Sequence, residues 1–354
     1  MVQAGHIGRE QMSENDLEKP NSMRVDDIRP DDLRSGQVAA YERDLQRLRQ
    51  RIDEFVSVSC PACGADAPEA AFEKYGFQFQ RCRCCGTLYM SPRPTPDVMA
   101  SYYGNSENYR FWAKHIFPAS EAARREKIHR PMLEYIVAAC ERYSVRPDLL
   151  VEVGPGFGTF AALVNQSGAF GQVITVERTP EMAQACRDRG ITVIERAVED
   201  VASEEIGQAD MLVSFEVIEH LFDPASYVQS VAQLLREGGL ILLTCPNGAG
   251  FDTSMLGARS GAVDSEHVNL FNPDSLAGLL ERLGFDVLEV ETPGRLDAEL
   301  VRGAVLEGDL DLSTNWFLQT VLIDKWEQAG EAFQAFLASN RLSGHLRVLA
   351  RKRE

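Results

Sequence analysis

Four cysteines in two C-x2-C pairs have the spacing of a metal site. Cys60 and Cys63 form the first pair, Cys82 and Cys85 form the second, and a glycine follows each pair. Thiolates at this spacing bind one tetrahedral Zn²⁺ and leave no open position on the ion. The pattern therefore predicts a structural zinc ribbon, with reactive thiols or a disulfide as the alternative interpretation. Cys84 is an additional thiol that could replace a neighbouring ligand.

A glycine-rich turn between an apolar run and a helical pattern is a candidate ligand site. Gly154, Gly156 and Gly158 would let a ligand approach the main chain closely, although tight turns also use glycine for structural reasons alone. Glu152 is placed to hold a charged amino group and would repel a pyrophosphate. Glu177 ends the next predicted strand, where an acid can accept the hydroxyl protons of a ribose. These residues predict a site for a nucleoside with a cationic tail.

A carboxylate and histidine motif follows the fourth predicted strand of the same region. Glu216, Glu219 and His220 share one face of a helical turn, and His267 follows the fifth strand and should return to the same sheet edge. Oxygen and imidazole donors suit a divalent cation, so these four residues are candidate ligands of one. In the metal-free alternative, His220 and His267 act as general bases, or His220 only packs against the sheet.

The elements that would position these residues form an alternating pattern beyond Asp148. Short apolar runs alternate with helical patterns, which predicts an α/β fold with a doubly wound, mostly parallel, seven-stranded sheet. The helical stretch before the last strand is predicted either to lie over the active site as a lid or to cover a sheet edge. The expected organisation is a mobile tail (1–30), an amphipathic helix (31–56), the zinc ribbon (57–95), a helical connector (96–145) and the catalytic domain (146–354) with a helical insertion (295–340).

Composition narrows the classes of partner. Hydrophobic residues make up 44% of the 354 residues and charged residues 25%, as in folded globular proteins. The formal net charge of −17 would repel a polyanion, so nucleic acid is a disfavoured partner. The N-terminal residues lack the apolar segment of a signal peptide, and no apolar run is long enough to span a membrane. A cytoplasmic location without membrane attachment is therefore predicted, whereas the pattern gives no oligomeric state.

Four segments follow one another along the chain, namely VEVGPGFGTF, ITVERT, MLVSFEVIEHL and LLREGGLILLTCPN. Their order is typical of class I S-adenosylmethionine-dependent methyltransferases, which the chain resembles over about residues 130–352. Pro155, between the first two glycines, departs from the family pattern and stiffens the loop. The resemblance implies a methionine-binding set of Glu152, Gly154, Gly156 and Gly158, a ribose-binding Glu177, an adenine-binding region around Glu199, and Phe215 and Glu216 beside the cofactor.

The later motifs refine this resemblance. The ExxEH turn with a distant histidine is similar to metal-assisted O-methyltransferases of ubiquinone synthesis and of small-RNA termini, which implies Mg²⁺ or Mn²⁺. The cysteine module is similar to one in sugar C-methyltransferases, but those carry a tyrosine-histidine pair where this chain reads EHVNLF. We therefore expect O-methylation of a small-molecule or saccharide acceptor. C- or N-methylation of a nucleotide-linked sugar without a catalytic metal is one alternative, and a non-catalytic module that binds cofactor and a partner is another.

Overall fold

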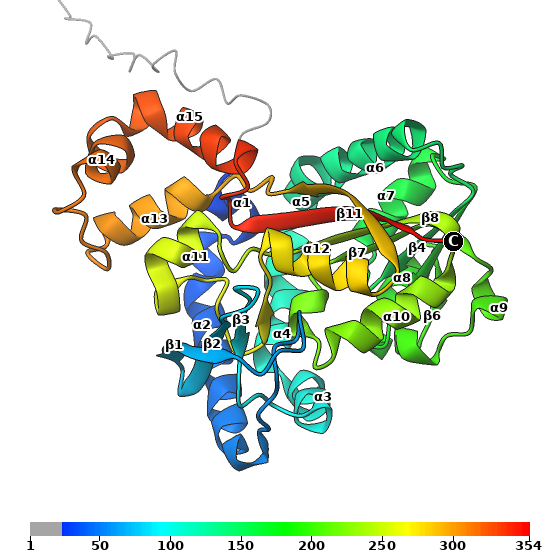
Figure 1. Cartoon of the computed structure of the whole chain (residues 1–354), viewed down its shortest axis with the longest axis horizontal. Helices are drawn as coiled ribbons and strands as arrows, with labels where there is room; N and C mark the ends of the chain where they lie inside the picture. The colour runs from blue at the N-terminus through cyan, green and yellow to red at the C-terminus, as the bar shows by residue number, and fades with distance from the viewer. Residues whose placement is uncertain (1–22) are drawn as a thin grey trace, which may run out of the picture.

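The computed structural model describes residues 23–354 and contains a seven-stranded sheet covered by helices (Figure 1). The strand order is β10-β11-β8-β7-β4-β5-β6, in which the five strands from β8 to β6 are parallel and β11 runs antiparallel between β10 and β8. This is the predicted doubly wound, mostly parallel fold. Its strands are β4 (Leu149–Val153), β5 (Gln172–Val176), β6 (Thr192–Ile194), β7 (Ala209–Phe215), β8 (Leu235–Pro246), β10 (Phe285–Glu291) and β11 (His345–Lys352).

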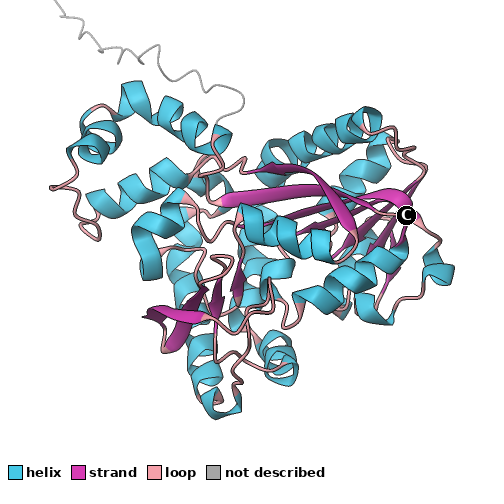
Figure 2. Cartoon of the chain, in the orientation of Figure 1, coloured by secondary structure: helices cyan, strands magenta, loops and turns pink. Residues whose placement is uncertain are grey.

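Helices cover both faces of this sheet (Figure 2). Neighbouring residues of β4 face opposite ways, so Leu150 packs in the core under α6 and α7 while Val151 packs in the core under α10 and α12. Both side chains are fully buried, and each such apolar side chain contributes about 2 kcal/mol. The helices of this domain are α6 (Arg130–Arg142), α7 (Thr159–Ser167), α8 (Pro180–Asp188), α9 (Ser203–Ile206), α10 (Pro224–Leu234), α11 (Phe251–Leu256) and α12 (Pro273–Arg282).

The cysteine module carries a second, smaller sheet. Its strands are β1 (Pro68–Lys74), β2 (Phe77–Cys82) and β3 (Leu88–Met90), and all pairings are antiparallel. The fourth strand, β9 (Asn269–Leu270), comes from the catalytic domain and pairs with β3. The sequence pattern indicated no strand at this position. The zinc-ribbon module and the catalytic domain therefore share a sheet.

The N-terminal segment differs in part from the predicted mobile tail. Residues 1–22 lie outside the described residues, but Val25–Ile28 form a short helix, α1. Asp27 pairs with Lys127 at 2.8 Å, and the Ile28 carbonyl accepts from Arg124 at 3.0 Å, so contacts with later helices hold this helix in place. The following helices are α2 (Asp31–Arg49), α3 (Pro96–Asn105), α4 (Glu107–Phe111) and α5 (Phe117–Arg124).

The helical insertion before the last strand contains α13 (Asp297–Leu306), α14 (Trp316–Gln319) and α15 (Trp326–Ser339). Its apolar side chains pack with one another and with Phe251 and Met255 of α11. Trp316 is 76% exposed. That this insertion lies over the active site as a lid stays a prediction.

Within the described part of the chain, no helix is long and apolar enough to cross a membrane.

Candidate active site and metal centres

The glycine turn joins β4 to α7 at the carboxyl edge of the sheet. Gly154, Gly156 and Gly158 have φ values of 73°, 56° and 72°, a region that favours glycine. A Cβ on Gly154 would lie 2.6 Å from Val217 Cγ2, whereas a Cβ on Gly156 would meet no atom within 4 Å. The main chain at Gly156 therefore borders open space, as expected where a ligand approaches the backbone.

Two acids flank this turn in the positions that the sequence indicated. Glu152 is buried, and its Oε2 has no hydrogen-bond partner among the described residues. Burial raises the pKa of Glu152 to about 8. Glu177 is also buried, and its Oε1 accepts from the Thr179 amide at 2.7 Å. A buried carboxylate oxygen without a hydrogen-bond partner is unfavourable, so Glu152 suits a ligand with a positive charge.

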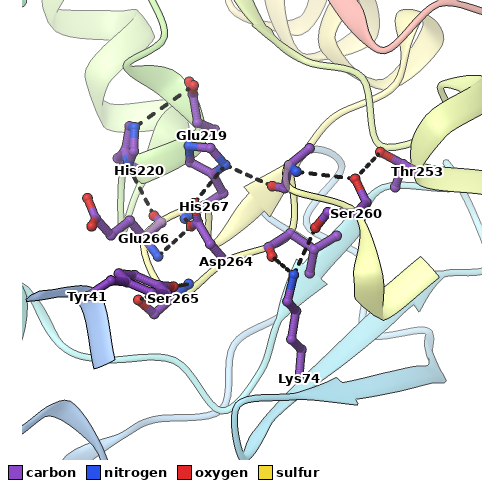
Figure 3. Close-up of polar contacts among 12 residues, drawn as sticks. Tyr41, Lys74, Glu219, His220, Thr253, Ser260, Asp264, Ser265, Glu266 and His267 are labelled. Atoms are coloured by element: carbon purple, nitrogen blue, oxygen red, sulfur yellow. Dashed lines mark hydrogen bonds and ion pairs between the residues drawn. The ribbon is translucent and has the colours of Figure 1, made fainter. Parts of the chain in front are cut away.

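Three of the four predicted cation ligands converge at the same edge of the sheet. One donor atom from each of Glu219, His220 and His267 lies within 4.8 Å of the others. Figure 3 shows the two imidazoles side by side, and their ring centroids are 4.7 Å apart. Glu219 is fully buried, and neither carboxylate oxygen has a hydrogen-bond partner within residues 23–354. Burial and the nearby Glu216 raise the pKa of Glu219 well above its usual range.

The hydrogen bonds of both histidines leave one nitrogen of each ring available. His220 Nδ1 lies 3.2 Å from the Glu266 carbonyl, and His267 Nδ1 lies 2.8 Å from the Ala262 carbonyl. A carbonyl oxygen can only accept, so Nδ1 carries the proton and Nε2 has a free lone pair in the neutral ring. Burial and the neighbouring His267 lower the pKa of His220 to about 3, which keeps this ring neutral near pH 7. Two such rings beside a carboxylate are donor types that could hold a divalent metal ion.

The fourth predicted ligand, Glu216, points elsewhere. Its side chain is 46% exposed, accepts from Thr244 Oγ1 at 2.8 Å and lies 3.6 Å from His345 Nδ1. Its φ of 54° is rare for a residue with a side chain, so the turn after β7 is strained at the edge of the site.

Phe215 packs edge-on against Phe160, with ring centroids 5.0 Å apart, beside the glycine turn. The roles of Glu216, Phe215 and the exposed Glu199 in binding stay predictions.

Two tyrosines of the helical connector reach this site. Tyr103 Oη lies 3.4 Å from His220 Nδ1, and Tyr102 donates to Glu266 Oε1 at 2.9 Å. Both residues lie on α3, and the pair of adjacent tyrosines in the sequence is the feature that could have indicated a functional site. Tyr103 is therefore a functional candidate that sequence reasoning missed.

The four predicted zinc ligands also converge. Cys60 Sγ lies 3.5 Å from Cys85 Sγ, and Cys63 Sγ lies 3.6 Å from Cys82 Sγ. These distances are too long for a disulfide of about 2.05 Å and are close to the edge of about 3.8 Å in a tetrahedron with Zn–S bonds of about 2.3 Å. Burial opposes ionisation of Cys82, but hydrogen bonds from the Cys85 and Cys84 amides outweigh it and bring its pKa to about 7. The donor set fits a tetrathiolate metal site.

Comparison with known proteins gives the class. The model of the methyltransferase domain family matches residues 124–290, a segment that contains the glycine turn, Glu177 and both histidines of the site. The ubiquinone biosynthesis O-methyltransferase of Xanthomonas axonopodis pv. citri is 30% identical over 171 residues, which cover 45% of this chain and 70% of that protein. The chain therefore belongs to the class I S-adenosylmethionine-dependent methyltransferases, and it is an enzyme of that class.

Two further proteins are similar to this chain. The ubiquinone biosynthesis O-methyltransferase of Xanthomonas euvesicatoria pv. vesicatoria is also 30% identical over 171 residues, with the same coverage of both chains. A solved structure of an S-adenosylmethionine-dependent methyltransferase from Clostridium acetobutylicum has a TM-score of 0.46 and 12% identity. It covers 70% of this chain and 99% of that protein.

Proposed function

We propose that this methyltransferase methylates a hydroxyl oxygen of a small molecule or saccharide, with Mg²⁺ or Mn²⁺ bound by Glu219, His220 and His267. The observation that supports the metal is that, among the described residues, the Nε2 atoms of both imidazoles make no hydrogen bond and lie beside a buried carboxylate that has no hydrogen-bond partner. Carboxylate and imidazole donors suit these ions. When bound, such an ion supplies Lewis acidity that lowers the pKa of an acceptor hydroxyl.

The remaining residues of the site bind and orient the methyl donor. In this proposal Glu152 holds the ammonium group of S-adenosylmethionine, and the open main chain at Gly156 receives its methionine part. Glu177 accepts the ribose hydroxyls at the end of β5. The Tyr103 phenol, beside His220, borders the acceptor and helps to exclude water. We further propose that the four cysteines bind one structural Zn²⁺, because their sulfur distances fit a tetrahedron.

Removal and return of the divalent ion tests this function. The protein is treated with a chelator at neutral pH, its zinc content is measured to verify that the ribbon is intact, and candidate hydroxylated acceptors are assayed by product mass. We expect methyl transfer to fall by about 100-fold or more and to recover with Mn²⁺ or Mg²⁺. Full activity in chelator would reject the metal and favour the alternative in which His220 or His267 acts without one.

Binding of S-adenosylhomocysteine should depend on pH through Glu152. This acid has a pKa of about 8 in the free protein and must lose its proton to hold the ligand's ammonium group. Below that pKa, binding releases a proton, so Kd should tighten as pH rises from about 6 to 8, by up to about tenfold per pH unit. Titration calorimetry measures this slope.

Two variants are matched controls for this pH dependence. Glu152→Gln should bind more weakly with a flat pH profile, whereas Glu177→Gln should weaken binding at every pH and retain the slope. A wild-type Kd that stays constant across this pH range would contradict the role of Glu152.

A further inference from the structure

The zinc-ribbon module contacts the backbone on both sides of His267. Met90 of β3 donates to the Val268 carbonyl at 3.0 Å, immediately after this histidine. Lys74 of β1 donates to the carbonyls of Ser260 and Val263 at 2.8 and 2.6 Å (Figure 3). The Ala262 carbonyl, which accepts from His267, lies in the same loop. Strands of the ribbon therefore hold the segment that carries one of the two histidines.

A buried arginine at the end of the ribbon contacts the other half of the site. Arg93 is 1% exposed, and its Nε donates to the Met90 carbonyl at 3.2 Å. Its Nη1 donates to the Phe222 carbonyl at 3.2 Å and to Asn269 Oδ1 at 2.9 Å. The guanidinium thus connects the ribbon, the segment after the 3₁₀ turn η6 (Ile218–His220) and strand β9. A rigid, planar donor group can satisfy several acceptors at once.

Asn269 continues this connection to the turn that carries Glu219 and His220. Its side chain is fully buried, and its Nδ2 donates to the Leu221 carbonyl at 2.7 Å and to the Ile218 carbonyl at 3.2 Å. The Glu219 carbonyl is a weaker third acceptor at 3.4 Å. Buried carbonyls need donors, and a short 3₁₀ turn supplies few of its own. The conformation of η6 therefore depends on Asn269, whose orientation is set by Arg93.

We propose that Arg93 and Asn269 are positioning residues through which the zinc-ribbon module fixes the geometry of the catalytic turn. Together with the β3–β9 pairing, this hydrogen-bond relay places Glu219 and His220 from one segment against His267 from the other. The ribbon is then a part of the active-site scaffold, in addition to any contact that it makes with an acceptor. This inference rests on the proposed function in one respect, because the proposed function is what identifies Glu219, His220 and His267 as the catalytic site.

Hydrogen exchange in the zinc-loaded protein tests this relay independently of activity. Arg93→Lys keeps the positive charge but loses the planar fork, and Asn269→Asp keeps the shape and the bond to Arg93 but loses the donor. Arg282→Lys is the matched control, because Arg282 donates to the Ala62 carbonyl of the ribbon and to the Gly278 carbonyl at 3.0 Å but not to the catalytic turn. S-adenosylhomocysteine binding, measured by calorimetry, verifies that each variant is folded.

We expect amides of residues 217–222 to exchange about tenfold faster in Arg93→Lys and Asn269→Asp, with ribbon amides and S-adenosylhomocysteine affinity unchanged. The same variants should lower kcat while the Arg282→Lys variant retains it. Unchanged exchange at 217–222, or equally fast exchange throughout the ribbon, would overturn the relay. If the wild-type protein shows no methyl transfer while the exchange pattern appears as expected, the proposed acceptor chemistry fails and the relay stands.

Discussion

Replacing Glu219 by glutamine is expected to lower kcat by about 100-fold or more, with little change in S-adenosylhomocysteine affinity. Glutamine keeps the size of the side chain but removes the charge that would bind a cation. Both carboxylate oxygens of Glu219 are buried without a hydrogen-bond partner among the described residues, and His220 Nε2 lies 3.9 Å from Oε1, so a shared cation is the interaction that would satisfy this acid. Steady-state kinetics with added Mn²⁺, together with Mn²⁺ binding followed by electron paramagnetic resonance, measures both effects.

Glu216→Gln is the matched control for this substitution. Glu216 belongs to the same sequence motif, but its carboxylate is bound to Thr244 and lies outside the group formed by Glu219, His220 and His267. We expect this variant to retain Mn²⁺ binding. Equal loss of Mn²⁺ affinity in both variants would restore Glu216 as a fourth ligand and would show that its side chain turns toward the site when an ion binds.

The free energy of unfolding is a second measurement that tests the role of Glu219. A buried carboxylate without a partner is unfavourable for the metal-free protein, because no group replaces its lost hydration. The free energy of unfolding of Glu219→Gln should therefore equal or exceed that of the metal-free wild type, even as activity is lost. A variant that is both inactive and less stable would indicate a structural role for this acid.

The sheet could be predicted closely because its strands carry strong local signals. The short apolar segments LLVEV and FDVLEVE form β4 and β10, and helices α8 and α12 begin at Pro180 and Pro273, where proline favours the first turn of a helix. The glycine turn could also be predicted from the sequence, because the positive φ values at this strand-to-helix junction favour glycine. These features depend on residues that are close in sequence.

Features that depend on distant residues were not predictable in this way. Asn269 and Leu270 form a strand only because β3 lies beside them, and a two-residue strand has no periodicity of its own. The sequence likewise placed Glu216 and Glu219 on one helical face, whereas the turn is a 3₁₀ helix preceded by a left-handed residue, which separates the two side chains. The role of Tyr103 was missed for the same reason, because helix α3 meets His220 only in the folded chain.

Replacing Cys82 by serine is expected to have the other large effect, because it removes one of the four thiolates that converge in the ribbon. Structural zinc contributes on the order of 10 kcal/mol in small zinc modules, which is comparable with the total stability of a domain. The variant should lose its zinc, unfold at a lower temperature and lose at least about 100-fold in kcat. Metal analysis, thermal unfolding and the methyl-transfer assay measure these three quantities on the same sample.

Cys84→Ser distinguishes loss of zinc from loss of a thiol. Cys84 is exposed and lies outside the group of four, so its replacement should leave zinc content, stability and kcat unchanged. The effect of Cys82→Ser on kcat follows from the shared sheet, because a ribbon without its metal cannot hold β3 against β9, and Arg93 then no longer fixes Asn269. A zinc-free Cys82→Ser protein with full activity would contradict this prediction. It would show that the catalytic turn keeps its geometry without the ribbon and that the catalytic domain alone holds the segment that carries His267.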